Sequence, residues 1–389
     1  MDRSERPMSQ RNEVAAAPAT AGDSKTTRGA SGPDRSPAAR ALGILWWVLR
    51  FGLALFLFVG ALQLMKTGAS GLDVLQNRGL LVRNPGSTLG LGWIGALFVL
   101  SGSPIAATSL TLVAADSITE IQGFTMLTGS RLGAAFVVLV VAVVYALRSG
   151  KGGRLRPVAT AVTALSTTAL IYVPGMLLGA LLLNWGPYHS LELHFPGQFG
   201  DLIDVVYGGL LSRVESLPAA VVFLGALAVL LGSMKLIDSV MPDLDTDLES
   251  RRLQWVSKKW PMFGLGCLVA LITMSVSVAL TILVPLVAKR YVKREDILPY
   301  IMGANITTLG DTMLAAFALN SPAAVRIVLA SMISAAALSV VLLTFFYPQV
   351  RTLVWRFQRQ MTMSKPRLAG FTAALFLVPV SIILISGLA

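Results

Sequence analysis

Two stretches of the sequence decide the fold: residues 100–114, LSGSPIAATSLTLVA, and residues 274–288, MSVSVALTILVPLVA. Each has two serines one residue apart near its start and is otherwise mostly apolar. They lie within longer apolar segments, residues 91–115 and 261–288, which the serines interrupt. Each segment could be a single spanning helix or a re-entrant hairpin that enters the membrane and returns to the same side.

The surrounding sequence is that of a helical membrane protein. Hydrophobic residues make up 54% of the chain, charged residues only 13%, and the mean hydropathy is +0.70. Soluble domains have about 25% charged residues. The apolar residues fall in blocks of about 20 or more, the length a helix needs to cross a bilayer, and the short alternating segments of a β-barrel are absent. The predicted fold class is therefore an all-α integral membrane protein.

The distribution of basic residues predicts the topology. Seven other apolar segments are predicted to span: 41–65, 121–147, 157–183, 218–240, 297–319, 322–347 and 368–388. If both interrupted segments are re-entrant, every strongly basic loop lies in the cytoplasm, as the positive-inside bias requires. These loops are 148–156, 241–260, 289–296 and 348–367. We therefore expect about seven spanning helices and two re-entrant hairpins in a bacterial-type inner membrane, with the N-terminus cytoplasmic and the C-terminus external.

The expected organisation follows from the same segments. Residues 1–40 are rich in small and charged residues and are predicted to be a disordered cytoplasmic tail. Four parts follow: a first repeat at 41–156 with hairpin 91–115, a connecting helix and external loop at 157–216, a second repeat at 217–320 with hairpin 261–288, and C-terminal helices at 321–389. Within residues 218–240, Asp238 is expected to be solvated near the inner end of its helix.

Several function classes are excluded. The net charge of +12 comes from basic loops and not from a nucleic-acid-binding pattern, so no nucleic-acid partner is expected. Cys267 is the only cysteine, and His189 and His194 lie in a polar loop, so neither a disulfide nor a transition-metal site is expected. No catalytic triad and no Walker motif is present. We expect neither an enzyme nor a primary pump, and no covalently bound cofactor.

The two halves resemble each other when the chain is shifted by 174 residues. Eight identities then align without a gap, among them Ser101 with Ser275 and Ser103 with Ser277. A glycine follows the first serine of each pair after 28 residues: Gly129 follows Ser101, and Gly303 follows Ser275. Under the predicted topology the first hairpin enters from outside and the second from inside. Inverted repeats with interrupted helices are typical of secondary transporters that bind their substrate near the midplane.

At these residues the chain resembles the type II sodium/phosphate cotransporter family. The serine segments, followed by GSRLGAA at 129–135 and GANITTL at 303–309, are similar to the two signature repeats of that family over about residues 45–320. The resemblance implies a sodium-coupled carrier of phosphate or a similar small oxyanion. The substrate residues it implies are Ser101, Ser103, Ser275 and Ser277. The sodium ligands it implies are Asn305, Thr307, Thr308 and Thr281.

The chain departs from the family pattern at several positions. The family's glutamine falls on Leu100 and Met274, and in the first repeat its asparagine falls on Arg131. Arg131 and Asp311 should both lie inside the membrane, where charges are usually functional. One interpretation is a structural ion pair between them. The other is that Arg131 is a fixed cation beside the anion site, which would reduce the number of sodium ions needed for transport.

Other interpretations stay open. The serines could serve helix packing, since small residues let membrane helices approach closely. The Asn305 segment could make interhelical hydrogen bonds. The whole chain could be a membrane scaffold or sensor that has kept the fold without transport. The expected partners are a small anion, sodium and membrane lipid. The direction of transport and the formation of a homo-oligomer are not predicted by the sequence.

Overall fold

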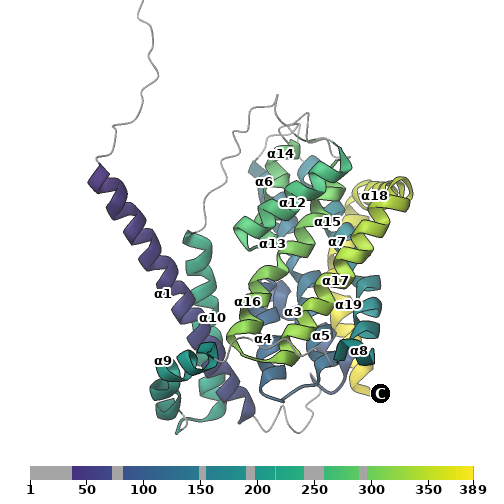
Figure 1. The fold of residues 1–389 in the computed structure, drawn as a ribbon. Helices are drawn as coiled ribbons and strands as arrows, with labels where there is room; N and C mark the ends of the chain where they lie inside the picture. Colours follow the sequence, from purple (N-terminus) through teal and green to yellow (C-terminus); the bar gives the residue numbers. More distant parts are fainter. Residues whose placement is uncertain are drawn as a thin grey trace, which may run out of the picture. The chain divides into compact units, whose positions relative to one another are not determined.

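The computed structural model describes residues 37–71, 82–148, 155–189, 198–214, 216–240, 258–288, 292 and 296–388. Every regular element within these ranges is a helix (Figure 1). Contacts divide the chain into two units, Met1–Trp46 and Trp47–Ala389. The described part of the first unit is the beginning of α1 (Pro37–Ser70). The predicted disordered tail therefore lies outside the described residues as far as residue 36.

Six helical stretches are long and apolar enough to cross a membrane. They are Leu42–Ser70 in α1, Glu120–Arg148 in α5 (Glu120–Ala134) and α6 (Phe136–Arg148), Arg156–Leu183 in α7 (Leu155–Leu183), Ala219–Val240 in α10 (Ala219–Val240), Pro322–Phe345 in α17 (Pro322–Phe345), and Lys365–Gly387 in α19 (Lys365–Leu388). The prediction of an all-α, multi-pass membrane protein is confirmed.

The seventh predicted span, residues 297–319, is not one continuous helix. It consists of α15 (Ile297–Thr307) and α16 (Leu309–Ala318), which are divided at Thr308. Thr308 keeps helical backbone angles, φ −66° and ψ −16°, so the interruption is local. The described residues contain six candidate spans where the sequence predicted about seven. The break alone does not account for the difference, because Glu120–Arg148 is a candidate span although α5 and α6 are divided at Ala135.

The two serine segments form helices too short to cross a membrane. The first segment contains α3 (Pro85–Val99) and α4 (Ser103–Ala114), of 15 and 12 residues. The second contains α12 (Lys259–Thr273), of 15 residues, and α13 (Val276–Thr281) and α14 (Leu283–Ala288), of 6 each. A spanning helix needs about 20 residues. In Figure 1, α12, α13 and α14 lie in the upper half of the helical bundle and α3 and α4 in the lower half.

Two segments predicted as loops contain helices. Within residues 184–217, predicted as an external loop, α8 (Gly186–His189) and α9 (Gln198–Val214) form. In the basic loop 348–367, α18 (Tyr347–Thr362) forms, and it buries Val350, Val354 and Gln358. The loop predictions gave weight to polar and charged residues. An amphipathic helix can carry those residues on one face and still pack with the other.

Glycines hold α5 against α3 and α15 against α12 at close range. A Cβ atom built on Gly92 of α3 would lie 2.0 Å from the carbonyl oxygen of Met126, and one on Gly266 of α12 would lie 2.0 Å from that of Tyr300. No side chain fits at such distances, so the backbones of each pair touch directly. The two contacts are 174 residues apart at both partners. Two more glycine contacts recur with the same offset: the Cβ position of Gly129 lies against the Leu89 carbonyl oxygen, and that of Gly303 lies against the Phe263 carbonyl oxygen.

Candidate functional site

The helix breaks at both serine pairs have the same backbone conformation. α3 ends at Leu100, with φ 56°, and α12 ends at Met274, with φ 46°. Non-glycine residues seldom adopt this left-handed conformation, which costs roughly 1–2 kcal/mol. At each break the chain turns sharply and a new helix begins within three residues. These two breaks are called the serine turns below, residues 100–103 and 274–277.

The two serine turns line one cavity of about 50 Å³. Ser101 and Ser103 reach it from the first turn, and Met274 and Ser275 from the second. Its other lining residues come from three helices: Asp311 and Leu314 of α16, Met234, Ile237 and Asp238 of α10, and Phe51, Leu55 and Phe58 of α1. The fold therefore joins residues that are 174 positions apart in the sequence. The space is sufficient for a small ion or roughly one or two water molecules.

The serine side chains differ in their hydrogen bonding. Ser275 precedes α13, and its hydroxyl accepts a hydrogen bond from the Val278 N–H at 3.4 Å. The hydroxyls of Ser101 and Ser103 have no hydrogen-bond partner among the described residues, so both can donate to a ligand in the cavity. The side chain of Ser277, the fourth predicted substrate residue, lies outside the described part of the structure.

Asp311 gives the cavity its buried charge. Asp311 and Arg131 are 8% and 1% exposed, and Arg131 Nη2 lies 3.8 Å from Asp311 Oδ1. Thr312 connects the two side chains, because its hydroxyl accepts from Arg131 Nη2 and donates to Asp311 Oδ1 at 2.8 Å. Asp311 Oδ2 and Arg131 Nε have no hydrogen-bond partner. One carboxylate oxygen of Asp311 is thus free to take a ligand.

Arg131 does not line the cavity between the serine turns. Its guanidinium is buried and lies 3.8 Å from Oδ1 of Asp311, the carboxylate that does line the cavity, so it balances the charge of that carboxylate. This geometry favours the structural ion pair over a fixed cation that faces an anion. An unpaired charge at this depth would be strongly unfavourable, so the pair also explains how either charge is tolerated.

The predicted sodium ligands are only partly free. Asn305 is fully buried, and its amide nitrogen donates to Thr168 Oγ1 at 3.1 Å and to the Ile301 carbonyl at 2.8 Å. Asn305 Oδ1 and Thr308 Oγ1 are buried oxygens without a hydrogen-bond partner. Buried polar atoms are nearly always satisfied, so two orphaned oxygens in one helical segment suggest an unfilled role as ligands.

The other two predicted ligands are engaged locally. Thr307 Oγ1 donates to the Cys267 carbonyl at 2.7 Å, which ties α15 to α12. Thr281 Oγ1 donates to the Val278 carbonyl at 3.1 Å, and none of the contacts described for it reaches Asn305 or Thr308. Each hydroxyl oxygen still has lone pairs, but the structure does not gather the four residues around one point.

Asp238 is a cavity residue that the sequence analysis missed. It was expected to be solvated near the end of its helix, and it is indeed exposed. It also lines the cavity together with Asp311. Arg50 donates to Ser239 at 3.0 Å, one residue along α10, but it does not line the cavity. An indicative signal was present in the sequence, because Asp238 is the one acidic residue within α10 and Lys235 is its one basic residue.

Comparisons of the chain with family models, with curated proteins and with solved structures found no match.

Proposed function

We propose that the chain is a secondary transporter of inorganic phosphate or a similar small oxyanion, coupled to sodium, with alternating access around the cavity between the serine turns. One observation supports this most: Ser101, Ser103 and Ser275 line the same cavity although they come from separate halves of the chain. Serine hydroxyls donate to oxyanions, and the N-terminal end of α4, which begins at Ser103, favours an anion.

In this proposal the segments 91–115 and 261–288 are re-entrant hairpins of two inverted repeats. Three features support it. The arms are shorter than a spanning helix. The left-handed turns and the glycine contacts recur with an offset of 174 residues. The basic loops fall on one side only if both hairpins return and α15 and α16 together cross the membrane. A re-entrant backbone is stable within a membrane where protein or a cavity surrounds it.

The charges around the cavity favour coupling to a cation. Arg131 is neutralised by Asp311, and a second carboxylate, Asp238, also lines the cavity. An oxyanion would therefore meet two carboxylates and no cationic side chain, and a sodium ion would compensate for this. Asp311, which lines the cavity, has a free Oδ2 that sodium can use; Asn305 Oδ1 and Thr308 Oγ1 are free oxygens as well, but these two residues do not line the cavity. We accordingly retain sodium coupling and do not favour replacement of sodium by Arg131.

The second candidate is a membrane scaffold or sensor that retains a transporter fold. The same two carboxylates favour it, since they make the cavity a poor site for an anion when no cation accompanies it. The family's glutamine positions are also occupied by Leu100 and Met274, which cannot donate hydrogen bonds.

Transport in proteoliposomes distinguishes the two candidates. Purified full-length protein is reconstituted, and radiolabelled phosphate movement is measured in both directions with a sodium gradient or with potassium instead. We expect sodium-dependent movement, and a fall in apparent affinity of roughly tenfold or more for Ser101→Ala with Ser275→Ala, because hydrogen bonds to a charged ligand are lost. Ser212→Ala, on exposed α9, is the matched control. Absence of phosphate movement in either direction would favour the scaffold or sensor.

A further inference from the structure

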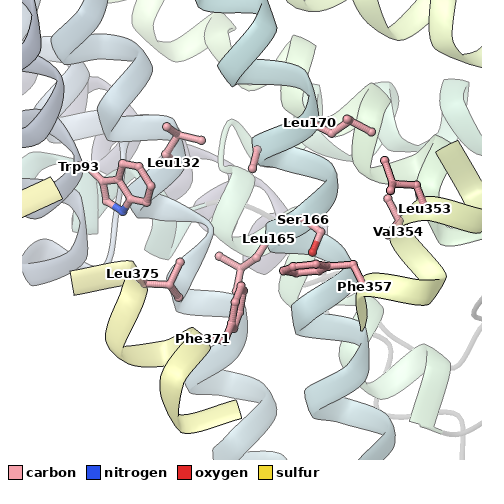
Figure 2. Close-up of a pocket in the computed structure, with 11 residues that line it drawn as sticks. Trp93, Leu132, Leu165, Ser166, Leu170, Leu353, Val354, Phe357, Phe371 and Leu375 are labelled. Carbon is pink, nitrogen blue, oxygen red and sulfur yellow. The ribbon is translucent and has the colours of Figure 1, made fainter. Parts of the chain in front are cut away.

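A second and larger space lies away from the serine turns. It is an apolar crevice of about 390 Å³ bounded by α3, α5, α7, α18 and α19. Figure 2 shows Leu165, Ser166 and Leu170 of α7 between side chains of α18 and α19. The full lining is Trp93, Leu132, Leu165, Ser166, Ala169, Leu170, Leu353, Val354, Phe357, Phe371 and Leu375. We call this space the α18 crevice.

The chemistry of the α18 crevice selects an apolar occupant. Among its lining side chains only Ser166 and Trp93 carry polar atoms. The Ser166 hydroxyl is already used, since it donates to the Val162 carbonyl at 2.7 Å. Water needs two to four polar partners, so an apolar space of this size does not hold water well. Since α7 and α19 are candidate membrane spans, the crevice lies at membrane depth, where acyl chains are the available apolar groups.

The position of α18 places a membrane surface beside the crevice. α18 connects two consecutive candidate spans, α17 and α19, and is itself too polar to be one. The chain must leave and re-enter the membrane on the same side, so α18 lies toward that side. Its packing is amphipathic, because Val354 and Phe357 line the crevice while Arg356 and Arg359 are exposed. Helices of this kind lie at the lipid headgroup boundary.

A basic residue of α19 lies on the same helix face as two residues that line the crevice. Arg367, Phe371 and Leu375 follow one another at intervals of four residues, so they share one helix face. Arg367 is exposed and has no ion-pair partner among the described residues, whereas Phe371 and Leu375 line the crevice. Phe371 also contacts Phe357 of α18 edge to face, with ring centroids 5.8 Å apart, which joins the two helices at this point.

The charge of the whole C-terminal part favours an anionic partner. Residues 347–389 contain five basic residues and no aspartate or glutamate. Arg356 of α18 is exposed as well; it lines a separate groove with Arg351 and Arg359, and it reaches the end of the crevice only by extending its long side chain. Basic residues at the end of a crevice between membrane helices are typical of sites for anionic lipid headgroups.

From these contacts we propose that the α18 crevice binds one anionic phospholipid, such as phosphatidylglycerol. An acyl chain fills the crevice between α7, α18 and α19, and the phosphate lies on Arg367 and Arg356. The long arginine side chains can follow the headgroup along the surface while their aliphatic parts stay against the helices. This site is separate from the cavity between the serine turns and does not depend on the proposed transport function.

The test is lipid binding to the purified full-length protein by native mass spectrometry, with titrations of phosphatidylglycerol and phosphatidylcholine that carry the same acyl chains. Arg356→Gln with Arg367→Gln removes the headgroup contacts, and Arg213→Gln with Lys235→Gln removes two exposed charges from α9 and α10 as the matched control. Ala169→Phe fills the crevice. Ala228→Phe, on an exposed position of α10, adds the same ring outside it.

We expect the protein to bind phosphatidylglycerol roughly tenfold or more tightly than phosphatidylcholine, and the double arginine change to remove this preference. Ala169→Phe should weaken phosphatidylglycerol binding, both controls should retain it, and glycerol 3-phosphate should not compete. Equal binding of the two lipids, or phosphatidylglycerol affinity within about twofold of wild type in the double arginine variant, would overturn the proposal. Full competition by glycerol 3-phosphate would show that the crevice takes no acyl chain. The arginines are exposed, so their variant decides the matter even if Ala169→Phe misfolds.

Discussion

Replacement of Arg131 by methionine tests how the buried charge of Asp311 is balanced. The two side chains are 1% and 10% exposed, and their nearest charged atoms lie 3.8 Å apart. At this distance two unit charges attract by about 4 kcal/mol when the effective dielectric constant is 20. Loss of one partner from a buried pair typically destabilises a protein by about 3–5 kcal/mol, because the remaining charge is left uncompensated. We expect Arg131→Met to fall in this range.

A double-mutant cycle separates the interaction from the loss of packing. Asp311→Asn alone should also destabilise the fold, because Arg131 is then left as an unpaired charge. The variant with both changes carries neither charge, so its destabilisation should be smaller than the sum of the single effects by about 2 kcal/mol or more. The measurement is reversible unfolding in mixed detergent micelles, followed by tryptophan fluorescence. Arg213→Met, on the exposed face of α9, is the control and should change stability by less than about 0.5 kcal/mol.

Two results would refute this reasoning. If Arg131→Met changed the free energy of unfolding by less than about 1 kcal/mol, Asp311 would not depend on Arg131 for its charge balance. If the two single effects simply added, the side chains would not interact. Arg131 would then be a free cation, and the charge balance inferred for the cavity would be wrong.

Two further predictions concern packing and a second ion pair. Gly266→Ala should destabilise the protein by about 1–3 kcal/mol, because its Cβ would lie 2.0 Å from the Tyr300 carbonyl oxygen. The control is Gly232→Ala, which has nothing within 4 Å of the added Cβ and should be neutral or stabilising. Equal melting temperatures for the two variants would contradict the close backbone contact. Glu120→Gln removes the ion pair between Glu120 and Arg326, whose two side chains are 24% and 12% exposed in that order. The variant should be destabilised by about 1 kcal/mol or less, and by less still at high salt. A salt-independent loss of several kcal/mol would contradict a partly exposed ion pair.

Much of the fold could be predicted because the membrane restricts the choices. Long apolar blocks must be helices, and six of the predicted spans are present as candidate spans. The breaks at Ser101 and Ser275 were predictable because small polar residues interrupt apolar runs there. The division at Thr308 was not, since a regular helix can carry a threonine inside it. Whether Thr308 interrupts the helix depends on how α15 and α16 pack.

The sequence predicted which residues belong to the site, but not how they are arranged in space. Ser101 and Ser275 were singled out by their duplication, but only the fold shows that they line one cavity. The role of Thr312 was hidden, because its hydrogen bonds depend on the approach of α5 to α16. The helix α18 could have been found, since Val350, Val354 and Phe357 recur at helical spacing within a segment read as a basic loop.

Structure determination of the purified protein in lipid nanodiscs, with sodium and phosphate present, tests the central claim most directly. We predict that the space between the serine turns, about 50 Å³ in this structure, is wider in the loaded protein. It should then hold tetrahedral density, with oxygens within about 2.5–3.0 Å of the Ser101, Ser103 and Ser275 hydroxyls, and cation density beside Asp311. A dry, occluded space between the turns under saturating phosphate and sodium would contradict it.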